Sequence, residues 1–405
     1  MLKQNLFVVF ELIKEVKQAV AGFSEQLIKI RHHLHAHPEI SFQEKETAAY
    51  LSKILSSWGI EHQNNIGGYG IVGLIQGRNP DKKIIALRAD MDALAIDEQN
   101  QIPYKSLNAG VMHACGHDMH MTCLLGTVKI LNDLKNDFEG TVKFIFQPAE
   151  EELPGGSIKM IEEGVLKNPD VEAIFAQHVF PELEAGEVGF KSGMYMASSD
   201  EVKLFIRGKG GHAAIPNNRD DTVLAAAQLI LELEKVLNAN KPQDVPSILA
   251  IGRFIANGTY NVIPSEVQLL GTFRTFSESW RIEAHQLIKE TAKKVALSYG
   301  INAEVVIRKG YPFLINNEKL TQKARQAAIE FLGKENVKDL EIRMTVEDFA
   351  RYGQLIPACF YRLGTGNKSK GITSNLHTPT FNVDEKSIET GTGLMVWMAL
   401  KNLSA

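Results

Sequence analysis

The sequence predicts an α/β protein in which both ends of the chain build a mostly parallel, covered β-sheet and the middle forms a smaller inserted α+β domain. Short apolar, β-branched runs alternate with helical stretches before residue 198 and again after Pro312. This alternation is typical of a parallel sheet with helices on its faces. The middle shows a β-α-β-β-α-β order, which indicates a ferredoxin-like unit. The expected domain segments are 1–198, 199–311 and 312–405, the second being the insertion.

The first segment opens with helices. The run 6–10 is apolar, but charged residues follow it within a turn, so we interpret it as part of an amphipathic helix and not as a signal sequence. Apolar residues then recur at helical spacing before Pro38 and again before Gly59, which predicts two helices. The strands expected after them are 71–75, 84–87, 142–146 and 171–176, with helices around 122–134 and 156–163.

The insertion and the last segment continue in the same way. The insertion is expected to contain strands at 202–207, 248–255, 267–275 and 303–308, and helices at 222–237 and 277–298. The last segment is expected to contain a helix at 319–331, a buried strand at 358–363 and an amphipathic helix at 386–403.

Composition limits the class of protein. The chain has 405 residues with 44% hydrophobic and 23% charged residues, so it is long enough to bury a large core. Its formal net charge of −4 provides no basic field for phosphates, and nucleic acid is not an expected partner. No stretch of about 18 apolar residues occurs, so no membrane span is expected. Three cysteines indicate free thiols in a reducing compartment, and we expect a cytoplasmic protein.

Histidines gather at two places in the sequence. His113, His117 and His120 surround Cys115 in one segment, and a thiolate and an imidazole two residues apart suit a borderline-soft cation such as Zn²⁺. Gly116 between them permits the bend that would aim both at one point. The second group precedes Pro38, and we interpret it as a solvated helix end. Its members are His32, His33, His35 and His37.

Carboxylates follow two of the predicted strands. Glu150 and Glu151 come directly after the strand at 142–146, at the kind of strand end where α/β proteins bind ligands. Adjacent carboxylates in one crevice repel each other unless a cation neutralises them, so a metal explains the pair. Asp90 and Asp92 follow the strand at 84–87 and would orient a ligand imidazole as hydrogen-bond acceptors.

Two further histidines complete a possible donor set. His178 ends an apolar strand, and His377 lies in a Gly- and Ser-containing loop. Each alone is more often structural than catalytic. Together with Cys115, His117 and the glutamates, they provide enough soft and hard donors for two metal ions.

These residues resemble the metal-dependent amidohydrolases of the aminoacylase and carboxypeptidase G family, in the subfamily of hippurate hydrolase, N-acyl-amino-acid deacylases and plant auxin-conjugate hydrolases. The likeness covers nearly the whole chain and its motifs follow the family's order. They are LHAHPE at 34–39, RADMDAL at 88–94, HACGHD at 113–118, QPAEE at 147–151, GGHAA at 210–214, NVIP at 261–264, EDF at 347–349 and LHTP at 376–379.

The resemblance implies a zinc-peptidase-like catalytic domain with an inserted lid and dimerisation domain. It implies two divalent ions per subunit, Zn²⁺ or Mn²⁺ first and Co²⁺ or Ni²⁺ as alternatives, and a homodimer or dimer-based tetramer. The implied metal ligands are Cys115, His117, Glu151, His178 and His377. Val346 and Glu152 depart from the residues common in relatives and leave the substrate in doubt.

The expected reaction is hydrolysis of the amide bond of an N-acyl amino acid. Glu150 would act as general base, and Asp90 would support the ligands as a hydrogen-bond acceptor. On the inserted domain, His212 would donate to the developing oxyanion, in relatives from the partner subunit. Arg274 and Asn261 would bind the substrate's free α-carboxylate.

Three alternatives remain at this stage. A thiol hydrolase would use Cys115 as nucleophile and His117 as base, although two residues apart is poor geometry for that pair. A non-enzymatic protein would keep the metal for structure alone. A dipeptidase of the same family would differ only in having a free amine on the acyl side. Removal of metal by a chelator separates the first from a metalloenzyme.

Overall fold

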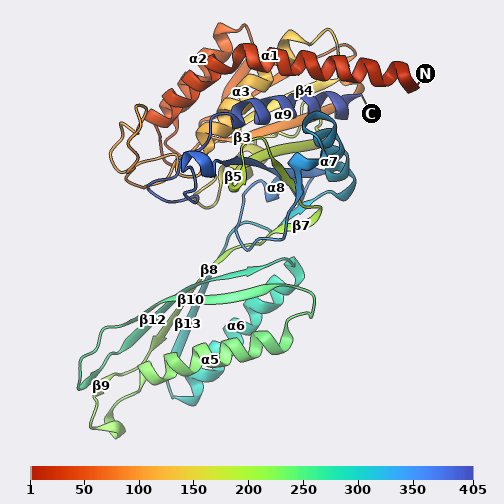
Figure 1. Cartoon of the computed structure of the whole chain (residues 1–405). Coiled ribbons are helices and arrows are strands. Elements are labelled where there is room, and N and C mark those ends of the chain that lie inside the picture. Colours follow the sequence, from red (N-terminus) through yellow and green to blue (C-terminus); the bar gives the residue numbers. More distant parts are fainter. Residues whose placement is uncertain (1, 405) are drawn as a thin grey trace. The chain divides into compact units, whose positions relative to one another are not determined.

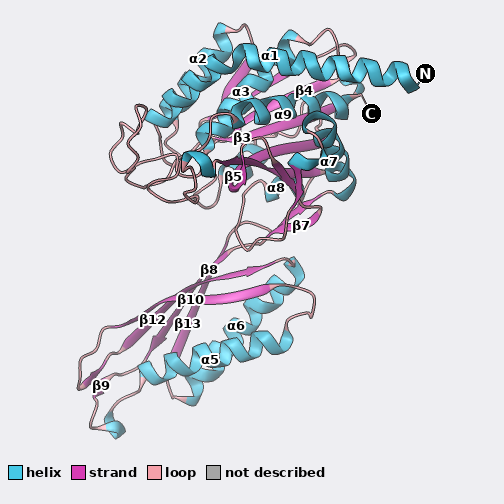
Figure 2. Ribbon diagram, viewed as in Figure 1, coloured by secondary structure: helices cyan, strands magenta, loops and turns pink. Residues whose placement is uncertain are grey.

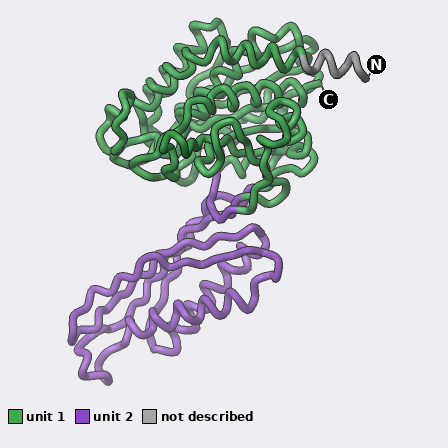
Figure 3. The backbone as a smooth tube through the Cα atoms, viewed as in Figure 1, with its two compact units in different colours: residues 1–195, 315–342, 348–405 green, residues 196–314, 343–347 purple. Residues whose placement is uncertain are grey.

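The computed structural model describes residues 2–404, and side chains from Glu11 onward. The chain divides into two compact units, of which unit 1 comprises residues 1–195, 315–342 and 348–405, and unit 2 comprises 196–314 and 343–347 (Figure 3). The sequence placed the inserted segment at 199–311. Unit 2 also includes five residues from the later part of the chain, because Ala197 N–H donates to the carbonyls of Arg343 and Thr345.

Unit 1 is built on an eight-stranded mixed sheet with the order β1-β2-β4-β3-β5-β16-β6-β15. Figure 1 labels its strands β3, β4 and β5. Its central neighbours β4, β3, β5 and β16 are parallel, whereas β1, β2 and β6 run antiparallel to their neighbours in the order β1–β2, β2–β4 and β16–β6. The strands are β1 (His62–Ile66), β2 (Gly70–Gln76), β3 (Ile84–Asp90), β4 (Thr141–Gln147), β5 (Ala173–Glu184), β6 (Val188–Phe190), β15 (Val337–Asp339) and β16 (Ala358–Gly366).

Helices cover both faces of this sheet (Figure 2). One large core joins the apolar faces of five helices to alternate residues of the strands, such as Leu87, Phe175 and Tyr361. The opposite face packs on two short helices, where the rings of Phe349 and Phe360 lie 5.4 Å apart. The helices are α1 (Leu2–Ala36), α2 (Lys45–Ser57), α3 (His117–Asp133), α4 (Gly156–Glu162), α7 (Glu318–Leu332), α8 (Ala350–Gly353) and α9 (Ser387–Leu403).

The structure confirms the predicted α/β class and changes several elements. The apolar run at 6–10 and the first predicted helix belong to one continuous helix, α1. The strands β1, β6 and β15 were not predicted, because they are short or half polar and gain their partners only within the sheet. The run expected at 171–176 begins at Ala173 and extends to Glu184, so that His178 lies inside β5 and does not end it.

Unit 2 has the β-α-β-β-α-β order that the sequence predicts, and its sheet order β10-β12-β8-β13 with antiparallel neighbours is that of a ferredoxin-like unit. Both helices pack on one face of the sheet. Its main elements are β8 (Asp200–Arg207), α5 (Thr222–Asn240), β10 (Ser247–Ala256), β12 (Glu266–Thr275), α6 (Glu278–Ser298) and β13 (Asn302–Lys309). A two-stranded ribbon joins β9 (Gly211–His212) and β11 (Val262–Ile263), and a second one joins β7 (Gly193–Met196) and β14 (Leu314–Asn316).

Candidate metal centre and active site

The bend at Gly116 places Cys115 beside the first turn of α3. Gly116 has φ of +81°, and a Cβ there would lie 2.5 Å from Cγ2 of Val179. Only glycine accepts both this backbone conformation and this close approach without strain. The bend therefore sets Cys115 and His117, the first residue of α3, in the same buried cluster, as the sequence predicts.

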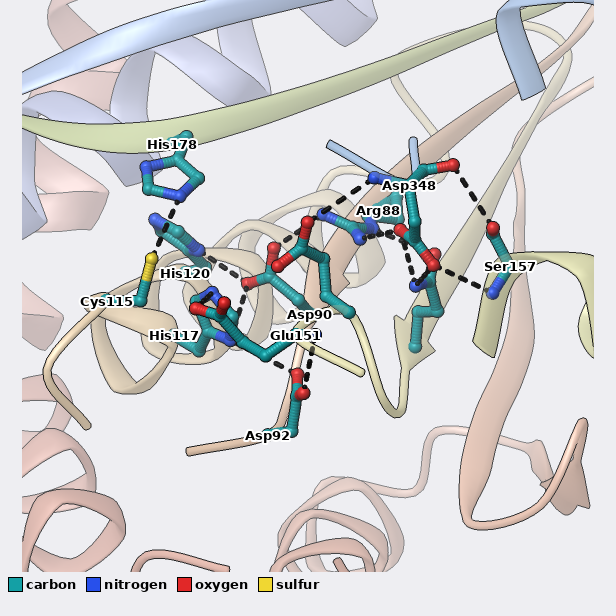
Figure 4. Close-up of polar contacts among 12 residues, drawn as sticks. Arg88, Asp90, Asp92, Cys115, His117, His120, Glu151, Ser157, His178 and Asp348 are labelled. Carbon is teal, nitrogen blue, oxygen red and sulfur yellow. Dashed lines mark hydrogen bonds and ion pairs between the residues drawn. The ribbon is translucent and has the colours of Figure 1, made fainter. Parts of the chain in front are cut away.

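The Cys115 thiol contacts two imidazoles that come from distant parts of the chain. Its Sγ lies 3.4 Å from Nε2 of His178 and 3.3 Å from Nε2 of His377 (Figure 4 shows the first contact). Nδ1–H of His178 donates to the carbonyl of Val179 at 2.8 Å, so its Nε2 presents a lone pair on the side of Cys115. This is the tautomer that a metal-binding histidine needs.

Glu151 and Asp92 connect the remaining ligand candidates. Oε1 of Glu151 lies 3.2 Å from Nε2 of His377 and 3.9 Å from Nε2 of His117. Asp92 faces His117 from behind, with its Oδ1 3.3 Å from Nδ1 of the ring, and its Oδ2 accepts the backbone N–H of Glu151 at 2.9 Å. The side chain of Ser41 donates to the same Oδ2 at 2.6 Å. Asp92 therefore orients two ligand candidates at once.

Overlapping groups of these five residues satisfy the spacing of a metal site. The ligand atoms of Cys115, His117 and His178 all lie within 4.8 Å of one another, and the same holds for Cys115, Glu151 and His377. Nε2 of His117 and Oε1 of Glu151 are buried without a hydrogen-bond partner among the described residues. Buried polar atoms are nearly always paired in proteins. Divalent cations would satisfy them, so these residues fit the metals that the sequence implies.

Burial and neighbouring charges favour the protonated forms of two ligand candidates. Burial, followed by the charges of Glu151 and Glu150, raises the pKa of the Cys115 thiol well above its usual range. Burial lowers the pKa of His117, but the carboxylates of Asp90 and Asp92 more than offset it and raise the pKa to about 10. Metal ligands must be deprotonated, so metal binding at this site is coupled to proton release.

His120 lies beside the ligands but has no nitrogen left for a metal. Its Nδ1 lies 2.5 Å from Oδ1 of Asp90, and its Nε2 accepts the backbone N–H of Val179 at 2.8 Å. Asp90 Oδ1 is 3.8 Å from Nδ1 of His117, farther than Asp92 is. Asp90 thus orients His120, which in turn holds the strand that carries His178, and Asp92 is the nearer of the two aspartates to His117.

The two neighbouring glutamates differ in their surroundings. Glu151 faces the thiol and imidazole cluster, whereas Oε1 of Glu150 accepts the backbone N–H of Asp348 at 3.3 Å. Glu150 is buried, and its carboxylate lies within 4.8 Å of the ligand atoms of His117 and Glu151. The Glu150 carboxylate therefore lies at the edge of the ligand cluster and is held there by the N–H of Asp348.

The histidines before Pro38 correct one interpretation made from the sequence. His35 is fully buried, with Nδ1 2.9 Å from Oδ2 of Asp118 and Nε2 3.2 Å from Oε1 of Glu98. The same Asp118 oxygen lies 3.1 Å from Nε of the buried Arg31. The solvated interpretation is wrong for His35, because α1 turns this side of its last turns into the core.

The other predicted site residues belong to unit 2. His212 and Val262 are register partners in the ribbon of β9 and β11, which brings Asn261 close to His212. Nδ1 of the exposed His212 accepts the backbone N–H of Ala214 at 3.1 Å, so a neutral ring carries its proton on Nε2 and can donate there. The guanidinium of Arg274 on β12 is half-buried, and its Nη1 donates to the carbonyl of Met344 at 2.6 Å.

Comparison with known proteins identifies the family. Residues 86–401 match the model of peptidase family M20/M25/M40. The chain belongs to this family. N-acetylcysteine deacetylase of Bacillus subtilis is 39% identical over 374 residues, which are 91% of this chain and 94% of that protein. IAA-amino acid hydrolase ILR1-like 4 of Arabidopsis thaliana is 36% identical over 386 residues, or 94% of this chain and 86% of that protein.

A solved member of the M20 family has the same architecture. The crystal structure of the Bacillus subtilis YXEP protein, described as a dinuclear metal binding peptidase, superposes with a TM-score of 0.81 at 34% identity, covering 95% of this chain and 99% of that one. The resemblance inferred from the motifs is confirmed: this M20 protein is a metal-dependent amidohydrolase. Among residues 2–404, no helix is both long and apolar enough to cross a membrane.

Proposed function

We propose that the enzyme hydrolyses the amide bond of N-acyl amino acids, with an acetyl, benzoyl or similar acyl group, and releases a carboxylic acid and a free amino acid. The observation that carries the proposal is the separation of roles between two adjacent carboxylates. Glu151 faces His377 and His117, while Glu150 is held by the N–H of Asp348 at the edge of the same cluster. A carboxylate that binds metal cannot also carry protons, so a hydrolase of this kind needs one carboxylate as a metal ligand and another as the general base.

The ligands are proposed to be Cys115, His117, Glu151, His178 and His377. Two divalent cations, Zn²⁺ or Mn²⁺ first and Co²⁺ or Ni²⁺ as alternatives, would lower the pKa of a water and polarise the scissile carbonyl.

The protein's own groups then carry the protons. Glu150 accepts a proton from the attacking water as the water oxygen bonds to the carbonyl carbon. It returns this proton to the amine nitrogen as the carbon–nitrogen bond breaks. Burial of Glu150 excludes bulk water from this exchange.

Three residues of unit 2 support a substrate with a free α-carboxylate. His212 would donate its Nε2–H to the oxyanion, since the bond from Ala214 fixes the tautomer. Arg274 offers a planar guanidinium suited to a carboxylate, and its bond to Met344 holds one end of that group. Asn261 adds an amide donor beside His212. His212 would serve the active site of a partner subunit in a homodimer.

The experiment compares substrates on the metal-loaded enzyme. Purified protein loaded separately with Zn²⁺ and Mn²⁺ is assayed with N-acetyl, N-benzoyl and N-indoleacetyl amino acids, with the corresponding amino-acid amides, and with free dipeptides. A hydrogen bond to a charged group contributes about 1.5–3 kcal/mol, or roughly ten- to hundredfold in kcat/KM. Arg274→Ala should therefore lower kcat/KM for the acids by that factor and leave the amides, already slow, nearly unchanged.

Arg253→Ala, at an exposed arginine on the neighbouring strand β10, is the matched control and should change neither substrate. Equal losses on acid and amide in Arg274→Ala would refute the role of the carboxylate. Faster cleavage of free dipeptides than of N-acyl amino acids would instead establish the dipeptidase alternative.

A further inference from the structure

A buried arginine joins the two halves of the catalytic site. Arg88 lies on β3 and is 1% exposed. Its Nη1 donates to Oδ2 of Asp90 at 2.5 Å, its Nε donates to Oε1 of Gln147 at 3.0 Å, and its Nη2 donates to Oδ1 of Asp348 at 2.8 Å (Figure 4). The planar guanidinium thus binds three side chains that come from β3, from the end of β4 and from the segment before α8. No other side chain offers this fork of donors.

Asp348 is fixed on every polar atom. Its Oδ1 accepts from Arg88 and from Nε2 of Gln147, the latter at 2.9 Å, and its Oδ2 accepts from the same Nε2 at 2.7 Å and from the backbone N–H of Ser157 at 3.0 Å. Its carbonyl accepts the hydroxyl of Ser157 at 3.1 Å. The side chain and the carbonyl of Asp348 are both held, which limits the movement of its backbone. Its N–H is the group that donates to Oε1 of Glu150.

The other end of the network reaches the metal ligands. Asp90, bound to Arg88 by Oδ2, uses its Oδ1 to bind His120. His120 accepts the N–H of Val179, the residue that follows His178. One guanidinium therefore fixes the carboxylate of Glu150 through Asp348 and supports the ligand side through Asp90.

We propose that Asp348 and Arg88 are positioning residues that aim the carboxylate of Glu150 at the substrate and set its place relative to the metal ligands. The proposal rests on the function proposed above, in which Glu150 carries the proton. Asp348 acts on Glu150 through its peptide N–H. Arg88 acts on Glu150 through Asp348 and on the ligand side through Asp90.

Structure alone would not require this arrangement. A buried arginine between two carboxylates costs desolvation, and hydrophobic replacements of buried ion pairs are often neutral or stabilising. This network lies where β3, the end of β4 and the segment before α8 meet beside Glu150, the proposed base. A rigid support of this kind maintains the catalytic geometry to within the small tolerance that general base catalysis allows.

The test is a double-mutant cycle between Asp348→Asn and Glu150→Gln. Outer hydrogen-bond partners in metal sites typically contribute 10–100-fold to activity, so Asp348→Asn should lower kcat by about that factor. KM should change less than about twofold and the metal content should remain that of wild type, because the perturbed group acts on turnover and not on binding. On the Glu150→Gln background, Asp348→Asn should cause less than about a twofold further loss, because the base it positions is already gone.

A second variant keeps all buried charges paired in case Asp348→Asn does not fold. Ser157→Ala removes the hydroxyl bond to the Asp348 carbonyl, worth about 1 kcal/mol, and should lower kcat about fivefold on the wild-type background and not on Glu150→Gln. Arg88→Lys keeps the charge but cannot reach all three acceptors, so it should lower both kcat and metal affinity.

The matched control is Asp200→Asn, which removes a carboxylate from the buried pair with Arg281 in unit 2. It should reduce stability without changing the kcat of the folded enzyme. An equal loss in kcat from Asp348→Asn on both backgrounds would overturn the positioning role while leaving the proposed function intact. A Glu150→Gln enzyme with wild-type kcat would overturn the proposed function, and the positioning role with it.

Discussion

Replacing each of the two neighbouring glutamates by glutamine should separate proton transfer from metal binding. Glu150→Gln keeps the size of the side chain and retains an oxygen that can accept the N–H of Asp348, so its position should not change. It removes the proton-accepting group. General acid–base catalysis contributes about 10²–10⁴-fold, which corresponds to about 2.7–5.4 kcal/mol in the barrier at 1.36 kcal/mol per tenfold. Both metals should stay bound.

Glu151→Gln should behave differently. Oε1 of Glu151 lies 3.2 Å from His377 and is buried without a hydrogen-bond partner in the part of the chain that the structure describes, so the carboxylate is a ligand candidate and not a proton carrier. A neutral amide is a weaker ligand for a divalent cation, and the first shell loses one charge. The loss of activity should therefore be accompanied by loss of metal.

The assay measures metal content and turnover on the same samples. After dialysis against metal-free buffer, metal per subunit is determined by elemental analysis, and kcat is measured before and after addition of excess Zn²⁺ or Mn²⁺. Excess metal should partly restore Glu151→Gln and should not restore Glu150→Gln. If the two variants show equal metal content and equal residual kcat, the division of roles between the glutamates is wrong.

Three further outcomes follow from the structure. Cys115→Ala should lose metal along with activity, since its thiol contacts two imidazoles, whereas Cys123→Ala in the core should keep its metal and its kcat; elemental analysis distinguishes them. Mixing inactive His212→Ala with inactive Glu150→Gln should restore activity if the subunits share a site, because one of two sites is then intact, and no recovery after proven exchange would refute that sharing. Burial raises the pKa of Asp200, but its hydrogen bonds to a histidine and an arginine outweigh this and lower the pKa from 3.8 to about 2. The ionised carboxylate therefore stabilises the folded protein above pH 4, and this contribution is lost as the pH falls toward 2. Urea unfolding should show wild type losing about 1 kcal/mol of its advantage over Asp200→Asn between pH 5 and pH 3, and a constant difference would refute the shift.

The sequence by itself determined the fold class and supplied the candidate site residues. Short apolar runs that alternate with helical stretches predicted the α/β pattern, because strands covered on both faces are buried along their whole length, whereas helices bury one face. The bend at Gly116 was readable because the Cys-Gly-His spacing is local. The order of the short motifs indicated the family, and the match over residues 86–401 confirms it.

Only the tertiary structure decided which of these residues meet. Cys115, His178 and His377 lie far apart in the chain, and their contacts depend on strand register and on where loops return. The burial of His35 depends on α1 facing the core, which a local pattern of four histidines does not encode. Asp348 was noticed as part of a motif, but its grip on Glu150 acts through a backbone N–H, a group that every residue except proline has, so no side-chain pattern in the sequence distinguishes it.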